Sequence, residues 1–134
     1  FTMMEMLIVL VIMGVVAGLA VPAYFRTVEQ ARSNEPKVNL NIIHMGQKLS
    51  HLNNGSFGAG GAGSIAAVNS ALGTDMGATY YTTVSMTVSG SGAGARYIAR
   101  LTRNNVQGGA GTKFFEYDYT QGAANPTLNE GGAF

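Results

Sequence analysis

Glu5 is the residue in this sequence whose setting most clearly calls for chemistry. It precedes an uncharged and largely apolar run from Met6 to Phe25. A carboxylate beside apolar surroundings is costly unless a positive charge or strong hydrogen-bond donors meet it. The run contains no Lys, Arg or His, and the nearest cation is the α-amino group of Phe1. Because residues four apart share a helix face, Glu5 can meet its own amino group or that of a neighbouring copy, or it can stay solvated in a headgroup layer.

The two histidines and two of the acids are weaker candidates. His44 and His51 lie seven residues apart, which separates them by about 10 Å along a helix and is too far for one metal. We expect both to face solvent. Asp118 and Glu130 could join a calcium site, but two isolated carboxylates supply too few ligands, and we expect them to face solvent as well. No set of acids, bases and nucleophiles converges, so we expect no enzyme, no cofactor and no metal.

The charge balance argues against a nucleic-acid partner. The formal net charge is +1, from 8 basic and 7 acidic residues, so the chain has no strongly basic character. Arg96, Arg100 and Arg103 could form a basic stripe on the exposed face of a sheet. Neighbouring acids balance them, and we interpret them as a solvated or subunit-contact face.

The apolar run can span a membrane. Twenty helical residues reach about 30 Å, the thickness of the hydrocarbon core of a bilayer. Pro22 removes the hydrogen bond to the carbonyl of Gly18 and predicts a kink. Gly14 and Gly18 each reduce the stability of the helix by about 1 kcal/mol relative to Ala. They can form a small-residue packing face, or the segment 14–22 can unwind when the helix leaves the bilayer.

The start of the chain resembles the mature N-terminus of a type IV pilin or pseudopilin. The resemblance rests on Phe1, Thr2 and Glu5, the unbroken apolar run, and the segment Val21-Pro22-Ala23-Tyr24, and it covers about the first 30 residues. The remaining residues carry no such signature. The chain also lacks cysteine, whereas many pilins close a C-terminal loop with a disulfide.

This resemblance implies a life cycle with two locations. A prepilin peptidase would remove a short basic leader, and Phe1 would be N-methylated. The chain would be a single-pass inner-membrane protein before assembly and part of an extracellular filament afterwards. The resemblance further implies that the apolar helices pack into the filament core, where Glu5 pairs with the amino group of Phe1 in an adjacent subunit.

The remaining pattern predicts one long helix followed by a small sheet. We expect the helix from about residue 2 to 53, ended by Asn53-Asn54-Gly55. A bend or a new helix start is possible at Pro36. An apolar stripe in its second half should be buried against the sheet: Val38, Ile42, Met45, Leu49 and Leu52.

Beyond the helix we expect a glycine-rich connector, a short helix and three strands. The connector spans residues 55–64, and the helix spans Ser64 to Leu72 with Gly73 as its stop. Period-2 patterns predict antiparallel strands at 80–88, 96–102 and 113–120. In the first of these, the even positions from Tyr80 should share one face. Turns are expected at 89–94 and 104–111, and an irregular tail at 121–134.

The sequence thus predicts an α+β, pilin-like fold without a disulfide: a long N-terminal helix packed on a small antiparallel sheet. Its parts are a transmembrane or filament-core half at 1–25, an amphipathic half at 26–53, and a globular head at 54–134. The leading hypothesis is the major structural subunit of a type IV pilus, a homopolymer built by pilus assembly machinery. The alternatives are the major pseudopilin of a type II secretion system and a membrane-anchored periplasmic binding domain. Adhesion, motility, DNA uptake and conduction all stay open.

Overall fold

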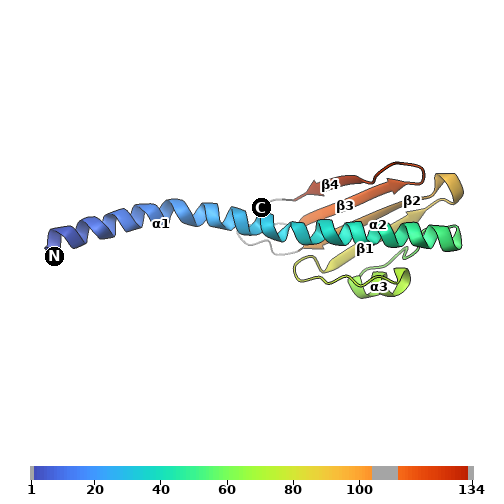
Figure 1. Cartoon of the computed structure of the whole chain (residues 1–134), viewed down its shortest axis with the longest axis horizontal. Helices are drawn as coiled ribbons and strands as arrows, with labels where there is room; N and C mark the ends of the chain where they lie inside the picture. Colours follow the sequence, from blue (N-terminus) through green and yellow to red (C-terminus); the bar gives the residue numbers. More distant parts are fainter. Residues whose placement is uncertain (1, 104–111, 133–134) are drawn as a thin grey trace. The chain divides into compact units, whose positions relative to one another are not determined.

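The computed structural model describes residues 2–103 and 112–132, and these form an α+β arrangement. The chain separates into two compact units, residues 1–33 and 34–134, each described by itself below. The elements, labelled in Figure 1, are in order α1 (Met3–Arg32), α2 (Asn34–Asn54), α3 (Ile65–Leu72), β1 (Thr83–Ser89), the short 3-10 helix η1 (Gly92–Gly94), β2 (Arg96–Arg103), β3 (Lys113–Thr120) and β4 (Thr127–Gly131).

The expected long helix is present as two consecutive helices, α1 and α2. Only Ser33 separates α1 from α2. Its backbone keeps right-handed helical angles, and its N–H donates to the carbonyl of Glu29 at 3.1 Å. Pro36 occupies the first turn of α2, where a missing N–H costs little. The helix ends at Asn54, and Gly55 follows with a positive φ of 72°, as the Asn-Asn-Gly signal predicts.

The second unit is an antiparallel sheet with α2 along one face and α3 beside it (Figure 1). The strand order is β1-β2-β3-β4, a simple meander. The predicted inward residues of β2 and β3 are buried, whereas Arg96 and Arg100 point to the other face. The short helix has the predicted ends, since Ser64 Oγ accepts from the N–H of Ala67 and Gly73 is left-handed. The buried centre combines residues of α2, α3, β1, β2 and β3: Leu40, Ile43, Val68, Val84, Tyr97, Leu101 and Phe115.

The sheet has four strands, and the expectation of three was wrong. The fourth, β4, lies in the segment that the sequence predicts to be an irregular tail, and it pairs with β3 from Phe114↔Gly131 to Asp118↔Thr127. Its residues are mostly exposed, so no apolar alternation marks it as a strand. Backbone hydrogen bonds to β3 hold it instead. The expected turn at 104–111 lies outside the described residues, as does Phe134.

The face of α2 that meets the sheet is not the predicted one. Four members of the predicted stripe are exposed, and the buried residues are Pro36, Asn39, Leu40, Ile43, Gly46 and Gln47. Only Leu40 and Ile43 of these are large and apolar, so a count of apolar residues selects the wrong face. At Gly46 a Cβ would stand 2.9 Å from Thr74 Cγ2, so only glycine permits the close approach of the loop after α3.

The buried polar residues of α2 hold loops by hydrogen bonds to their backbones. The Gln47 side chain is fully buried and binds Gly58 twice, donating to its carbonyl at 2.7 Å and accepting from its N–H at 2.9 Å. Asn39 donates to the carbonyl of Gly77 at 2.8 Å. These bonds satisfy groups that would otherwise be costly to bury. They also fix the loops on either side of α3 without a disulfide.

Glu35 makes the most extensive of these contacts. One oxygen of its carboxylate, Oε1, accepts from the backbone N–H groups of Thr79, Tyr80 and Tyr81 at 2.9, 3.0 and 3.1 Å. A bend at Thr79 and Tyr80 precedes β1, which begins at Thr83. Within β1 the even positions Val84 and Met86 are buried as predicted, but at the bend the expected alternation is reversed. As a result Tyr81 is fully buried and Tyr80 is 40% exposed, so the prediction that Tyr80 shares the inward face was wrong.

We predict that Glu35→Gln destabilises the second unit, because an uncharged amide replaces an anion that accepts from three donors. Hydrogen bonds to charged groups contribute more than neutral ones, and the site is partly exposed, so the loss should be about 1–2 kcal/mol. Urea unfolding of the full chain in detergent, followed by tyrosine near-ultraviolet circular dichroism, measures it. Glu130→Gln on exposed β4 is the matched control and should stay within about 0.5 kcal/mol of the unchanged chain. Equal effects of the two variants would contradict the role of Glu35.

Candidate assembly surface

The first turn of α1 places Glu5 in a capping box with Thr2. The Thr2 hydroxyl accepts from the N–H of Glu5 at 3.2 Å, and Glu5 Oε2 accepts from the N–H of Thr2 at 2.6 Å. This reciprocal pair satisfies two of the N–H groups that a helix start leaves open. The Thr-x-x-Glu spacing is a capping signal from which this pair could have been predicted. Phe1 lies outside the described residues, so pairing between Glu5 and Phe1 stays a prediction.

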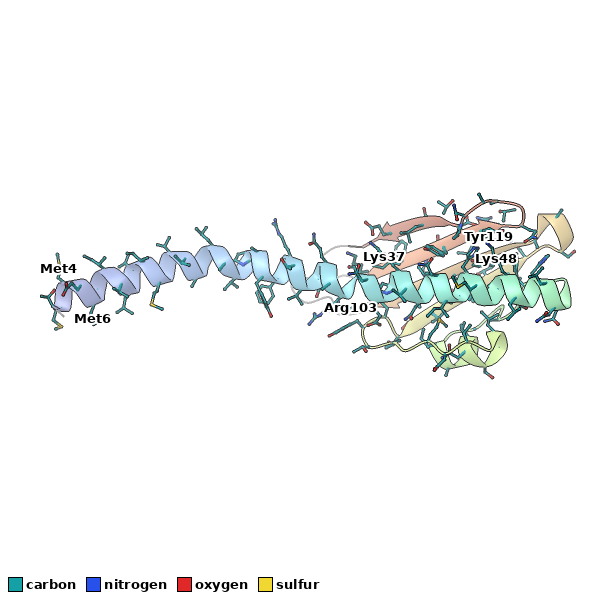
Figure 2. All side chains as sticks on the ribbon, viewed as in Figure 1. Met4, Met6, Lys37, Lys48, Arg103 and Tyr119 are labelled. Carbon is teal, nitrogen blue, oxygen red and sulfur yellow. The ribbon has the colours of Figure 1, made fainter. Side chains whose placement is uncertain are left out.

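The apolar part of α1 is exposed on all its sides. Large apolar side chains between Met3 and Phe25 have exposed fractions from 47% at Phe25 to 92% at Met3. They stand out around the whole helix in Figure 2, where Met4 and Met6 are labelled. By length and composition the helical stretch Met3–Asn54 can cross a membrane, and no residue of its most apolar window is buried. In water such a surface requires a cover, either lipid or protein.

The three residues proposed for packing or unwinding lie within this exposed helix. A Cβ added at Gly14 or Gly18 would meet nothing within 4 Å, so packing inside one copy does not require glycine at either position. The helix is continuous through Pro22. Unwinding of residues 14–22 when the chain assembles with other copies therefore stays a prediction.

A second apolar surface runs along α2. It consists of Val38, Met45, Leu49 and Leu52, which are 57%, 71%, 55% and 81% exposed. We call these four residues the α2 stripe. Their spacing of seven, four and three keeps them on one side of the helix. The stripe is an apolar face of the helix, as expected, but the expected contact of these residues with the sheet was wrong. In one copy of the chain nothing among the described residues buries it.

His44 faces the sheet, and the expectation of a solvent-facing histidine was wrong. Its Nδ1 lies 2.6 Å from the hydroxyl of buried Tyr97, and its ring meets Tyr119 edge-on at 4.8 Å between centroids. Burial, followed by the nearby charge of Lys48, lowers the pKa of His44. Burial raises the pKa of Tyr97, so its hydroxyl keeps its proton at neutral pH. Lys48 and Tyr119 are labelled in Figure 2, with Lys48 Nζ 6.0 Å from the tyrosine ring centre.

His51 also faces inward, which again differs from the expectation. Its ring packs 5.0 Å from that of Phe57, and Phe57 meets Tyr97 edge-on at 5.1 Å. Within the described part of the chain, the buried His51 Nε2 has no hydrogen-bond partner. The two histidines therefore serve as aromatic packing residues, His44 between α2 and the sheet and His51 between α2 and the glycine-rich connector.

The three arginines do not share a face. Arg96 forms an ion pair with Asp118, and Arg100 pairs with Glu116 at 2.8 Å, both on the outer face. Arg103 has the opposite parity along β2 and is buried, with its guanidinium 5.5 Å from the ring centre of Tyr80. Figure 2 shows Arg103 and Lys37 in the same part of the second unit. The hypothesis of a basic stripe is thus wrong, because Arg103 is not on the outer face. The charges of Arg96 and Arg100 are each balanced by an acid.

The pair proposed for calcium is not brought together. Asp118 is paired with Arg96, whose hydrogen bonds hold the pKa of Asp118 below its usual range. Glu130 lies opposite Phe115 in the β3–β4 register, and Asp118 lies opposite Thr127, so the two acids are on opposite faces of the sheet. Among residues 2–103 and 112–132, no group of three potential ligands is placed to hold a metal ion.

Comparison with known proteins adds no relative. No family model matches the sequence, and neither the curated proteins nor the solved structures gave a match. The function is therefore inferred from the residues and surfaces described above.

We predict that the second unit loses stability as the pH falls through 6.5, the ordinary pKa of histidine. The folded chain lowers the pKa of His44, so the unfolded chain binds its proton more readily in this range. The stabilising contribution is complete above pH 6.5 and is lost below it. The dependence should be shallow, because the ring is only partly buried.

Urea unfolding between pH 5 and pH 8, together with an NMR titration of the imidazole, checks this prediction. Lys48→Gln removes the second cause of the shift and should move the pKa of His44 back toward its ordinary value. An imidazole that titrates at or above that value in the folded chain would contradict the prediction.

Proposed function

We propose that this chain is the structural subunit of a type IV pilus. The observation that carries the proposal is the exposed apolar helix α1, attached to a folded second unit that does not use it as core. Before assembly lipid would cover this helix, making the chain a single-pass inner-membrane protein. After assembly the α1 helices of other copies would cover it in an extracellular filament.

The α2 stripe supports the same proposal. An isolated apolar residue on a surface needs no explanation, but an aligned set along a helix marks a contact surface. In the proposed filament the α2 stripe packs against apolar helix surface of other copies. The second unit would then contribute part of the filament core as well as its outer face.

Glu5 would set the register of the subunits. In the apolar filament core its carboxylate meets the amino group of Phe1 in a neighbouring subunit. A misplaced subunit would leave one charge buried without a partner, which costs several kcal/mol. In the capping box Oε2 already accepts from Thr2, so Oε1 is the oxygen we assign to the neighbour.

The proposal assigns no catalysis and no cofactor to this chain. Prepilin peptidase and the pilus assembly machinery would be its processing partners. No feature of the charge distribution favours a specific nucleic-acid partner.

Electron microscopy of material sheared from the cell surface tests the proposal, with mass spectrometry of the N-terminal peptide. We expect long thin filaments made of this chain, beginning at methylated Phe1. Processed chain that stays in the inner membrane without surface filaments would instead identify a pseudopilin of a secretion system. An unprocessed N-terminus would point to a membrane-anchored binding domain and would refute both filament roles.

We predict that Glu5→Gln sharply reduces surface filaments and leaves membrane insertion unchanged. Glutamine keeps the acceptor oxygen for the capping box but removes the charge that pairs with the amino group. Immunoblots of the sheared and membrane fractions measure both effects. Glu130→Gln removes an acid from exposed β4 instead and serves as the control, since this variant should fold and assemble like the unchanged chain. Filament yield from Glu5→Gln equal to that of the unchanged chain would exclude the pairing role.

A further inference from the structure

A polar cavity lies on the outer face of the sheet, on the side away from α2. It is a surface pocket that is open to solvent, with a volume of about 280 Å³, and it is lined by Arg96, Asp118, Thr120, Ala123, Asn125 and Thr127. We call it the β2–β4 cavity. Its floor follows from strand register, because Arg96 lies opposite Thr120 and Asp118 lies opposite Thr127. Directly paired residues and residues two apart share a face, so three neighbouring strands bring these four side chains together.

The wall of the cavity is the connection between β3 and β4, at the end of the sheet in Figure 1. This connection is anchored by two hydrogen bonds, from the N–H of Gln121 to the carbonyl of buried Ala95 at 2.8 Å and from Ala123 to Thr120 at 3.0 Å. Pro126 restricts the backbone of Asn125 before it to extended angles. The cavity is therefore formed before a ligand arrives, which lowers the entropic cost of binding.

The floor carries a fixed pair of opposite charges and no net charge. Arg96 donates from Nε to Asp118 Oδ1 at 2.7 Å and from Nη2 to Oδ2, a two-point geometry that orients both groups. The pairing keeps Asp118 ionised and Arg96 charged, since it lowers the pKa of the first and raises that of the second. A carboxylate has more lone pairs than these two bonds use, so Asp118 can accept further hydrogen bonds.

The other polar groups can both donate and accept. Thr120, Thr127 and Asn125, which carry two hydroxyls and an amide, line the cavity together with the ion pair. A ligand that complements this set needs several groups that each donate and accept, and it gains nothing from net charge. Those are the properties of adjacent hydroxyls on a sugar ring. The volume is just below the usual range for drug-sized ligands, which suits a mono- or disaccharide.

We propose that the β2–β4 cavity binds a neutral saccharide, with Asp118 and Asn125 accepting from ring hydroxyls and Arg96, Asn125 and the threonines donating to them. The site is an addition to the proposed function and does not rest on it, since it belongs to the second unit alone. On a filament it would give each subunit a carbohydrate contact.

The neighbouring ion pair on the same face provides a contrast. Arg100 pairs with Glu116 but lies over the ring of Phe114, with 4.4 Å from guanidinium to ring centre. Asn129, two residues along β4 from Thr127, donates to Glu116 at 3.4 Å. None of these four residues lines the cavity. An ion pair on this face is therefore not enough to form a cavity. The turn between β3 and β4, which carries Asn125, supplies the rest of the lining.

The test is an NMR titration of the isotope-labelled full chain in a zwitterionic phosphocholine detergent, which carries no sugar headgroup. The probes are the methyl glycosides of glucose, galactose, mannose and N-acetylglucosamine, with sodium acetate and sodium sulfate as charged competitors. We expect at least one glycoside to give saturable shifts confined to the amides of the cavity, with a Kd on the order of 1 mM.

Two variants and one control separate the site from general effects. Asn125→Ala and Thr127→Val each remove a hydrogen-bonding group from an exposed position and should weaken binding about three- to tenfold. Asn129→Ala, on the same strand and face but outside the cavity, should leave the Kd unchanged. Overlaid spectra away from the site show that each variant is folded.

Three results would overturn the proposal. The first is that no glycoside produces shifts at these amides up to about 100 mM, a hundredfold above the expected Kd. The second is that acetate or sulfate saturates the same amides at lower concentration than any glycoside. The third is that Asn129→Ala weakens binding as much as Asn125→Ala.

Discussion

The constraint on which the rest of this protein depends is the apolar surface of α1. That helix is apolar on every side, and the folded second unit does not draw on it for its core. An amphipathic helix could be satisfied by one neighbour, but a helix of this kind requires cover around its whole circumference. Lipid can provide that cover, and so can several copies of the same helix. The proposed pilus function follows from the exchange of one cover for the other.

The hydrophobic core of the second unit contains no residue of α1. This core joins α2, α3 and the sheet through large residues such as Leu40, Phe115 and Tyr97. Polar side chains of α2 then fix the loops: Glu35 binds the backbone of Thr79, 44 residues away in the sequence, and Gln47 binds the backbone of Gly58 in the nearby connector. These contacts hold the loops in a chain that contains no cysteine.

Much of this architecture could be predicted from sequence, because its signals are local. The apolar run, the Asn-Asn-Gly helix end, the Ser64 cap and the period-2 pattern of β2 and β3 each depend on neighbouring residues. The predictions that were wrong share a different cause, which is that they depend on contacts between separate elements. The buried face of α2 depends on Asn39 and Gln47, whose partners are separate loops, and the bend before β1 is held by Glu35.

The candidate sites also divide into one that is visible in the local sequence and others that depend on contacts between separate elements. Glu5 stands out in the sequence because a charge beside an apolar run is anomalous in itself. The histidines were assigned to solvent because their aromatic partners come from β2, β3 and the glycine-rich connector, which sequence spacing does not reveal. The β2–β4 cavity was missed for a similar reason, since it requires the register of three strands and a fourth strand without apolar alternation.

The most direct test of the account asks what covers α1 outside the membrane. Because the chain has no cysteine, Val11→Cys introduces a single reporter into the middle of the apolar helix. Lipid-free material sheared from the cell surface would be treated with a water-soluble maleimide, before and after dissociation in detergent. The account predicts that the chain is present in this material and that the thiol reacts only after dissociation, because other copies of α1 bury it. A thiol that reacts at once in the sheared material, or a chain confined to the membrane fraction, would contradict the account.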